Sequence, residues 1–341
     1  MNIPAANPQD LDVVVSAAPL LDALEERVLL AVATDYEQYM LELLNRARAN
    51  PAAEAARLGI DLNEGLAANT ISTAAKQPLT MNQFLVDAAQ GHSLWLLVNG
   101  VFDHTGINGT DPGQRMANAG YAFIPSYSWG ENIAYTASTV TLNYLQAAES
   151  LHNNLFVDSG VDGRGHRLNM MNASFREVGM GIAVGAYDPP PAGGTVYSST
   201  MMLTQDFAYS GSSIFLTGVA YSDAVLNDDF YTPGEGYNGV TVTATRTLDG
   251  AVFQTTTIAT GGYGLALPAG TYTVTATGGG LSAAITYHNV VVGAQNVKVD
   301  FTPSQGSQTY PVDQNALEDV ALVLTGTNKQ IILVDTTGQA T

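Results

Sequence analysis

Three short segments of this chain each place one ionisable side chain among glycines and small polar residues. They hold His104, Glu131 and His166. Imidazoles and carboxylates that come from separate elements and meet in one cleft form metal sites and acid–base sites in proteins. We therefore predict that these three residues are metal ligands or, if the protein is an enzyme, its catalytic residues. Each also has a structural interpretation: a loop histidine, a glutamate that accepts backbone N–H bonds, and a helix-capping histidine.

A fourth ligand can come from the segment between Glu131 and His166. Glu149 and His152 stand at i and i+3, so a helix at this place presents both side chains to one side. We expect one of them, with His152 slightly preferred, to complete a divalent-metal cleft with His104, His166 and Glu131. The alternative for His152 is a purely structural role.

A second candidate site lies further along the chain. Its oxygen-bearing side chains are Asp223, Asn227, Asp228, Asp229 and Glu235. Oxygen ligands spaced around a loop, with a glutamate about a dozen residues on, are what calcium requires. We predict a calcium site formed by Asp223, Asn227, Asp229 and Glu235; the alternative is a solvated acidic turn.

The elements that must position the first site are helices followed by strands. Apolar residues at a spacing of three or four predict helices from Thr34 or Asp35 to Asn50, over 82–99 and over 138–155. Two apolar, β-prone runs at 178–186 and 196–208 predict a hairpin with a proline-rich tip. This order indicates an α+β unit. His92 lies on the apolar face of the second helix and is predicted to be a buried, hydrogen-bonded core residue.

A second unit follows a polar linker at 209–213. Threonine, valine and glycine alternate there in six short runs that predict a small all-β sandwich. The runs are 214–221, 240–247, 252–258, 263–267, 271–277 and 285–292. The predicted organisation is an N-terminal arm at 1–33, a first domain at 34–210, a β-sandwich at 214–302, and a linker with a C-terminal tail at 303–341.

Charge excludes several classes of partner. The chain has 31 acidic and 12 basic residues and a formal net charge of −19. Such a surface repels nucleic acid and anionic bilayers, so we expect no nucleic-acid partner and no membrane insertion. No stretch approaches the roughly 20 apolar residues of a spanning helix. There is no cysteine, and the first residues do not form a recognisable signal peptide. We therefore expect either export by a route other than the Sec pathway or a truncated chain.

The ordered motifs resemble the CAP superfamily (cysteine-rich secretory, antigen 5 and pathogenesis-related proteins) in its bacterial form, over about residues 34–210. The matching segments are MLELLNRAR at 40–48, AQGHS at 89–93, FDH at 102–104, GENI at 130–133, GHRLNMM at 165–171, EVGMG at 177–181 and TQDF at 204–207. The resemblance implies an α/β/α sandwich with His104, His166 and Glu131 in a cleft that holds a divalent ion such as zinc. It also implies a secreted or cell-surface protein.

For function, the resemblance favours binding of a small lipid, a peptide or a surface ligand. The alternatives are a metal-assisted, peptidase-like hydrolase, in which Glu131 takes a proton from metal-bound water, and a structural adhesive module. Whether the protein is an enzyme stays open at this point. Residues 263–274 resemble transthyretin-like or B-repeat modules of bacterial surface proteins, and related Ig-like folds, which implies that the second domain is a calcium-stiffened spacer.

Overall fold

The computed structural model describes residues 32–189, 195–304 and 308–309. These residues belong to one compact unit that begins at Val32. Most of the predicted N-terminal arm and of the predicted C-terminal tail lie outside the described residues. Within the described part, none of the helices combines the length and the apolar character needed to cross a bilayer.

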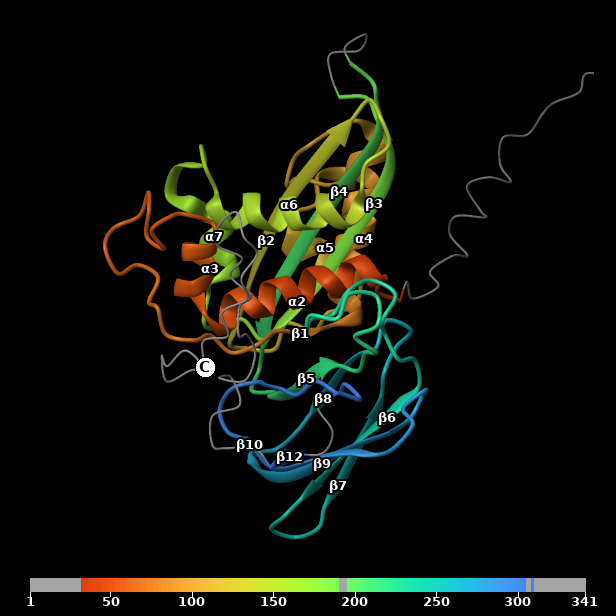
Figure 1. The fold of residues 1–341 in the computed structure, drawn as a ribbon. Helices are drawn as coiled ribbons and strands as arrows, with labels where there is room; N and C mark the ends of the chain where they lie inside the picture. The colour runs from red at the N-terminus through yellow and green to blue at the C-terminus, as the bar shows by residue number, and fades with distance from the viewer. Residues whose placement is uncertain (1–31, 190–194, 305–307, 310–341) are drawn as a thin grey trace, which may run out of the picture. The chain divides into compact units, whose positions relative to one another are not determined.

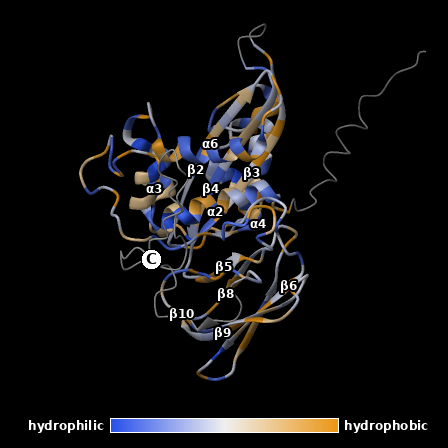
Figure 2. Ribbon diagram, viewed as in Figure 1, coloured by the Kyte–Doolittle hydropathy of each residue, from blue (hydrophilic) through white to orange (hydrophobic). Residues whose placement is uncertain are grey.

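The first helix begins at a well-defined cap. The helix α2 (Asp35–Ala49) starts after Thr34, whose hydroxyl accepts a bond from the Glu37 amide while the Glu37 carboxylate accepts one from the Thr34 amide. This capping box selects Thr34 over Asp35 as the cap. The short α3 (Pro51–Arg57) follows, with Asn50 as its cap. In Figure 2, α2 carries hydrophobic and hydrophilic residues along its length, and most of both kinds are buried.

A four-stranded sheet lies at the centre of the first part of the chain. Its strands are β1 (Thr80–Met81), β2 (Tyr127–Ser138), β3 (Glu177–Tyr187) and β4 (Tyr197–Ser210), in the order β1-β3-β4-β2. The predicted hairpin is β3 and β4, which pair antiparallel. The strand β2 was not expected as a strand, because Gly130, Glu131 and Asn132 interrupt its β-prone residues.

Helices cover both faces of this sheet (Figure 1). One face carries α4 (Gln83–Asn99) and α5 (Pro112–Asn118), and the other carries α2 and α6 (Tyr144–Val157). The short α7 (Gly165–Met170) lies beside β2. Helix α4 packs so closely on β3 that there is no room for a side chain at Gly179. A Cβ added there would lie only 2.0 Å from the Leu85 carbonyl carbon. The helices and sheet together form an α+β arrangement.

The helix predicted over 138–155 is α6, and it begins at Tyr144 and not at Ser138. Ser138 is the last residue of β2, and Asn143 caps the helix by accepting a bond from the Gln146 amide. Residues 139–143 between the strand and the helix are irregular.

Beyond residue 214 the described chain forms two further sheets. One contains five strands in the order β12-β10-β9-β6-β7 and the other three in the order β11-β5-β8. The strands are β5 (Phe215–Val219), β6 (Val240–Arg246), β7 (Val252–Thr256), β8 (Gly262–Ala266), β9 (Gly270–Gly278), β10 (Ile285–Val292), β11 (Val297–Lys298) and β12 (Gln308–Thr309). Buried side chains from both sheets, among them Leu216, Val242 and Val274, share one hydrophobic cluster.

The β-rich part is docked on the first part through buried contacts. Val219, Tyr221 and Tyr231 belong to the same hydrophobic cluster as Met40 and Leu43 of α2. The Lys298 ammonium lies 2.9 Å from the carboxylate of Glu42, and both side chains are buried. The two parts therefore share a core instead of being joined only by a linker.

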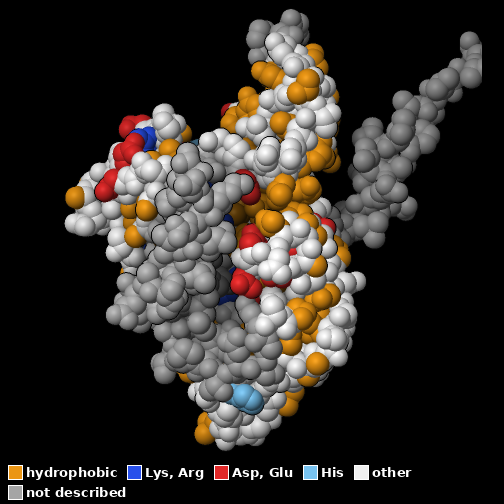
Figure 3. Space-filling view, in the orientation of Figure 1, with side chains coloured by type: hydrophobic (Ala, Val, Ile, Leu, Met, Phe, Trp, Pro, Cys, Tyr) orange, Lys and Arg blue, Asp and Glu red, His pale blue; other side chains and the backbone are white. Residues whose placement is uncertain are grey.

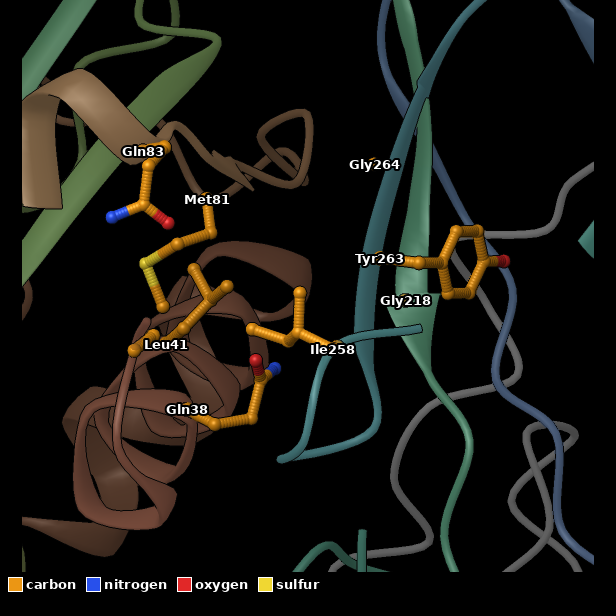
Figure 4. Close-up of a pocket in the computed structure, with 10 residues that line it drawn as sticks. Gln38, Leu41, Met81, Gln83, Gly218, Ile258, Tyr263 and Gly264 are labelled. Carbon is orange, nitrogen blue, oxygen red and sulfur yellow. The ribbon is translucent and has the colours of Figure 1, made fainter. Parts of the chain in front are cut away.

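Glycines allow the close approach at this contact. A Cβ added to Gly262 would lie 2.1 Å from Oε1 of Gln38 in α2. A cavity of about 150 Å³ remains nearby, lined on one side by Leu41 and Met81 and on the other by Gly218 and Gly264 (Figure 4). The Tyr263 ring points away from it.

Asn296 offers a direct test of the docking. It is buried, and its Nδ2 donates to the carbonyls of Pro78 (3.0 Å) and Arg176 (2.7 Å) while its Oδ1 accepts from the Phe215 amide (2.9 Å). We expect Asn296→Ala to lower the free energy of unfolding by about 2–3 kcal/mol, because buried groups lose their partners. Urea unfolding measures this change.

The matched control is Asn118→Ala at an exposed helix position, which should change stability by less than about 0.5 kcal/mol. Equal stability of the Asn296 variant and the wild type would contradict the role given to this side chain.

Candidate functional site

His104 and Glu131, both predicted for the site, form a pair in which the imidazole is exposed and the carboxylate is buried. Glu131 lies in β2, with its side chain only 1% exposed, and its Oε1 is 2.7 Å from Nδ1 of His104. Its Oε2 accepts a bond from the guanidinium of Arg115. The His104 side chain is 52% exposed, and its Nε2 has no hydrogen bond to the described residues. The buried carboxylate thus holds an imidazole whose other nitrogen is available.

Arg115 of α5 organises the loop that carries His104. Its Nη1 donates to the carbonyls of His104 (2.8 Å) and Thr110 (3.0 Å), while Nη2 donates to Glu131. Helix α5 is itself fixed by a capping box between Asp111 and Gln114. One arginine therefore ties α5, the loop and β2 together.

His166 is held by a different carboxylate, that of Asp158. Asp158 ends α6 in a left-handed conformation with a φ of 53° and is buried. Its Oδ1 is 2.7 Å from Nδ1 of His166, and its Oδ2 accepts from the amides of His166 (2.9 Å) and Arg167 (3.3 Å). Asp158 was not among the residues predicted for the site. The Asp158-Ser159-Gly160 turn after a predicted helix is the signal that indicates it.

Both histidines are attached to the same short stretch of β2. His104 contacts the Glu131 side chain, and the His166 carbonyl accepts a bond of 3.2 Å from Nδ2 of the next residue, Asn132. Asn169 of α7 donates to the Glu131 carbonyl at 3.2 Å. A Cβ added to Gly130 would lie 2.8 Å from Oδ1 of Asn169. The glycine in the Gly-Glu-Asn motif therefore lies where the Asn169 side chain of α7 reaches the strand.

His152 and Glu149 are not brought to this place. His152 is fully buried, with Nε2 at 2.8 Å from Oε1 of Glu54 in α3, and Glu149 accepts a bond of 2.8 Å from the Tyr39 hydroxyl of α2. The i, i+3 spacing does put both on one side of α6, but that side faces α2 and α3. The expectation that either completes the cleft of His104 and Glu131 is corrected accordingly.

The His152–Glu54 pair has the features of a structural interaction. Burial lowers the pKa of His152. Burial opposes the charge of Glu54, but the bonds from His152 and Arg57 outweigh it and hold the pKa of Glu54 below its usual range. A neutral imidazole that donates from Nε2 gives the ionised carboxylate a partner, while Nδ1 of His152 is buried without a hydrogen bond to the described residues.

The described residues contain no group of three or more His, Asp and Glu side chains placed to hold a metal ion. At Glu131 both oxygens are already engaged, one of them by the Arg115 cation. The residues therefore do not form a ready-made zinc site, and zinc binding by His104, His166 and Glu131 stays a prediction.

In the acidic loop predicted to bind calcium, two carboxylates accept hydrogen bonds from the backbone amides of the loop itself. Glu235 is buried and accepts bonds from the amides of Val225, Leu226 and Thr232. Oδ1 of Asp223 accepts from the amides of Asp228 (3.1 Å) and Asp229 (3.2 Å). Asn227 and Asp229 are exposed. Glu235 and Asp223 thus shape the loop, and calcium binding there also stays a prediction.

Two buried groups next to Glu131 were not predicted to belong to the site. His92 of α4 places Nε2 at 4.0 Å from Glu131 and at 3.1 Å from the Asp103 carbonyl. Asp206 of β4 is the cross-strand partner of Glu131 and is fully buried. Burial, followed by the Glu131 charge, raises the pKa of Asp206 well above 3.8. The exposed His104 thus stands above a buried polar cluster.

The family model for CAP, the cysteine-rich secretory protein family, matches residues 41–196. No curated protein matches the chain.

Several solved structures are similar. An extracellular protein with an SCP domain from Bacillus anthracis str. Ames is 24% identical, with a TM-score of 0.26, over 39% of this chain and 34% of that chain. NaASP2, solved with Zn2+, is 16% identical, with a TM-score of 0.32, over 51% of this chain and 80% of that chain. An outer surface protein from Borrelia burgdorferi is 16% identical, with a TM-score of 0.24, over 39% of this chain and 78% of that chain. This chain thus spans about a third of the Bacillus anthracis protein.

The buried His92 predicts a pH dependence of stability. Burial lowers its pKa from 6.5 to about 4. Between these values the unfolded chain binds a proton that the folded chain does not, so stability falls as the pH falls through this window. We expect His92→Gln to reduce the slope of unfolding free energy against pH by up to about 1.4 kcal/mol per pH unit. Urea unfolding from pH 7 to pH 4 measures it.

His288→Gln is the control, because this histidine is exposed in β10. It should leave the slope between pH 6.5 and 4 unchanged. Superimposable pH profiles for His92→Gln and the wild type would contradict the prediction.

Proposed function

We propose, for a chain whose residues 41–196 form a CAP domain, that this domain binds a small amphipathic ligand, such as a lipid, at the surface around His104. The observation that carries the proposal is the half-exposed imidazole of His104, held 2.7 Å from a buried carboxylate with Nε2 left available. Holding a polar group in advance reduces the entropy that a ligand must lose on binding.

Exposed apolar side chains accompany this imidazole. Phe102 precedes His104 by two residues and packs edge-on against Tyr135 of β2, with ring centroids 4.9 Å apart. Trp129 stands two residues before Glu131 on the same face of β2 and packs on Gly113. Exposed aromatic rings beside an oriented acceptor suit a ligand with an apolar body and a polar end.

The charge of the surface supports the same choice of ligand. Figure 3 draws the face of α2 and α6, where acidic and hydrophobic side chains lie near one another and Lys and Arg show in few places. With a net charge of −19, the protein repels anionic ligands at long range. The proposal includes a location outside the cell or on its surface, which rests on the CAP domain.

The hydrolase and adhesive interpretations stay as predictions. In the hydrolase, Glu131 takes a proton from a bound water, and for this it has to release His104 or Arg115. In the adhesive module His104 serves only the fold. We also propose that the two sheets beyond residue 214 form an Ig-like or transthyretin-like sandwich.

A monoacylglycerol with a C14 chain is a suitable probe for the ligand site. Trp129 is one of two tryptophans in the chain, so binding near it should change tryptophan fluorescence. We expect saturable binding that His104→Ala weakens about 3–10-fold, the effect of one lost hydrogen bond.

His288→Ala is the control and should bind as the wild type does. Absence of saturable binding would overturn the proposal. Unchanged affinity together with a lower melting temperature in His104→Ala would favour a structural role for this histidine.

Divalent ions are tested by thermal unfolding of the full chain. If the acidic loop binds calcium, millimolar calcium raises the melting temperature by mass action, and Asp229→Ala removes the increase. If the histidines bind zinc, zinc acts likewise and His104→Ala/His166→Ala removes that increase. No rise in the wild type with either ion would contradict both site predictions.

A further inference from the structure

This inference rests on the proposed ligand site. We infer that Asp158 is a positioning residue that holds His166 with Nε2 as a hydrogen-bond acceptor, as Glu131 holds His104. The CAP domain then presents two imidazole acceptors, and it selects ligands whose polar end donates hydrogen bonds, such as a hydroxyl or an ammonium group, over ligands that end in an anion.

The contacts of Asp158 are specific to His166. One carboxylate oxygen faces the ring nitrogen Nδ1 at 2.7 Å, and the other accepts from the backbone amide of the same residue at 2.9 Å. The side chain of Asp158 is 1% exposed. The Asp158 carbonyl in turn accepts a bond of 2.8 Å from Arg164, which fixes the turn between α6 and α7. The carboxylate therefore defines the ring orientation as well as the start of α7.

The chemistry of the pair determines which nitrogen carries the proton. A carboxylate only accepts hydrogen bonds, so the neutral imidazole beside it must carry its proton on Nδ1. Nε2 then bears a lone pair. The same argument applies to His104, whose Nδ1 faces Oε1 of Glu131 at 2.7 Å. Both rings are held in the tautomer that accepts at the outer nitrogen.

The elements that carry the two rings are anchored to adjacent residues of β2. Glu131, which holds His104, is followed in β2 by Asn132, which donates to the His166 carbonyl. Asn169 of α7 bonds both the Glu131 carbonyl (3.2 Å) and the Asn132 side chain (2.9 Å). Helix α7 and the His104 loop are thus anchored to consecutive residues of one strand.

The arginines around His166 do not provide an anion site. Arg167 directs its guanidinium to the carbonyls of Phe156, Val157, Leu62 and Glu64. Arg164 directs its own to the carbonyls of Glu64, Asp158 and Val161. These guanidinium donors are already bonded to backbone carbonyls. A carboxylate or phosphate needs donors, whereas the two rings offer acceptors. An anionic end is disfavoured for this reason.

The tautomer of His166 tests the role of Asp158. Long-range proton–nitrogen NMR of the full chain with 15N-labelled histidine shows which ring nitrogen is protonated. We expect Nδ1–H for His166 in the wild type. In Asp158→Asn, an amide oxygen remains to accept from the backbone while an NH2 group faces the ring, so the proton should move to Nε2. A merely structural role of Asp158 would not move it.

Asp162→Asn is the matched control, because Asp162 is exposed in the same loop, and it should leave the tautomer unchanged. An Nε2–H tautomer in the wild type, or no change in a folded Asp158→Asn, would overturn the positioning role. Circular dichroism confirms folding, and Asp158→Glu, which keeps the carboxylate, should retain Nδ1–H.

Ligand selection is tested with two probes of equal chain length. The C14 monoacylglycerol should bind the wild type at least about tenfold more tightly than myristate, and Asp158→Asn should lose about 3–10-fold of the affinity for the monoacylglycerol. Equal or tighter binding of myristate would overturn the selection rule while leaving the ligand site intact. Binding of neither probe would instead overturn the proposed function, and the tautomer experiment would still decide the role of Asp158.

Discussion

The structure depends on the pairing of polar side chains that α2 buries between the sheet and the β-rich part. Burying such groups without partners would cost several kcal/mol each. Glu37 accepts from the Ile182 amide of β3 (2.7 Å), Asn45 bonds both backbone groups of Leu79, and Arg48 donates to three carbonyls. Glu42 pairs with Lys298. Each partner lies on a different segment, so placing α2 also places β3, the strand entry at Leu79, α7 and β11.

The same pairing rule explains the docking of the second part. Burial raises the pKa of Glu42, and the Lys298 ammonium opposes that rise. A carboxylate at this depth needs its cation, because separating a buried pair leaves a charge that the interior does not solvate. The β-rich part therefore completes the environment of α2. Gly218, Gly262 and Gly264 line the cavity that remains at this contact.

Much of this could be predicted from the sequence, and the failures have a common cause. Helical spacing and the later β-prone runs predicted the α+β order, and the motifs led to His104 and Glu131, which do form a pair. Spacing also placed Glu149 and His152 on one side of α6 correctly. It could not show which neighbour that side meets, since this depends on how α6 lies against α2 and α3. Asp158 was missed because its role depends on a left-handed turn that places it beside a residue eight positions later.

The carboxylates at the site accept hydrogen bonds from other side chains of the protein, and this would limit their direct contact with a ligand. Glu131 and Asp158 each accept bonds from a histidine ring, and Glu131 also pairs with an arginine. A carboxylate engaged in this way is held by its donors and is poorly placed to contact a ligand directly. Its effect passes through the imidazole that it orients. The strongly acidic composition and the chemistry of the site are therefore separate matters: the negative surface acts at a distance, whereas in the proposed binding the imidazoles and aromatic side chains would make the contact.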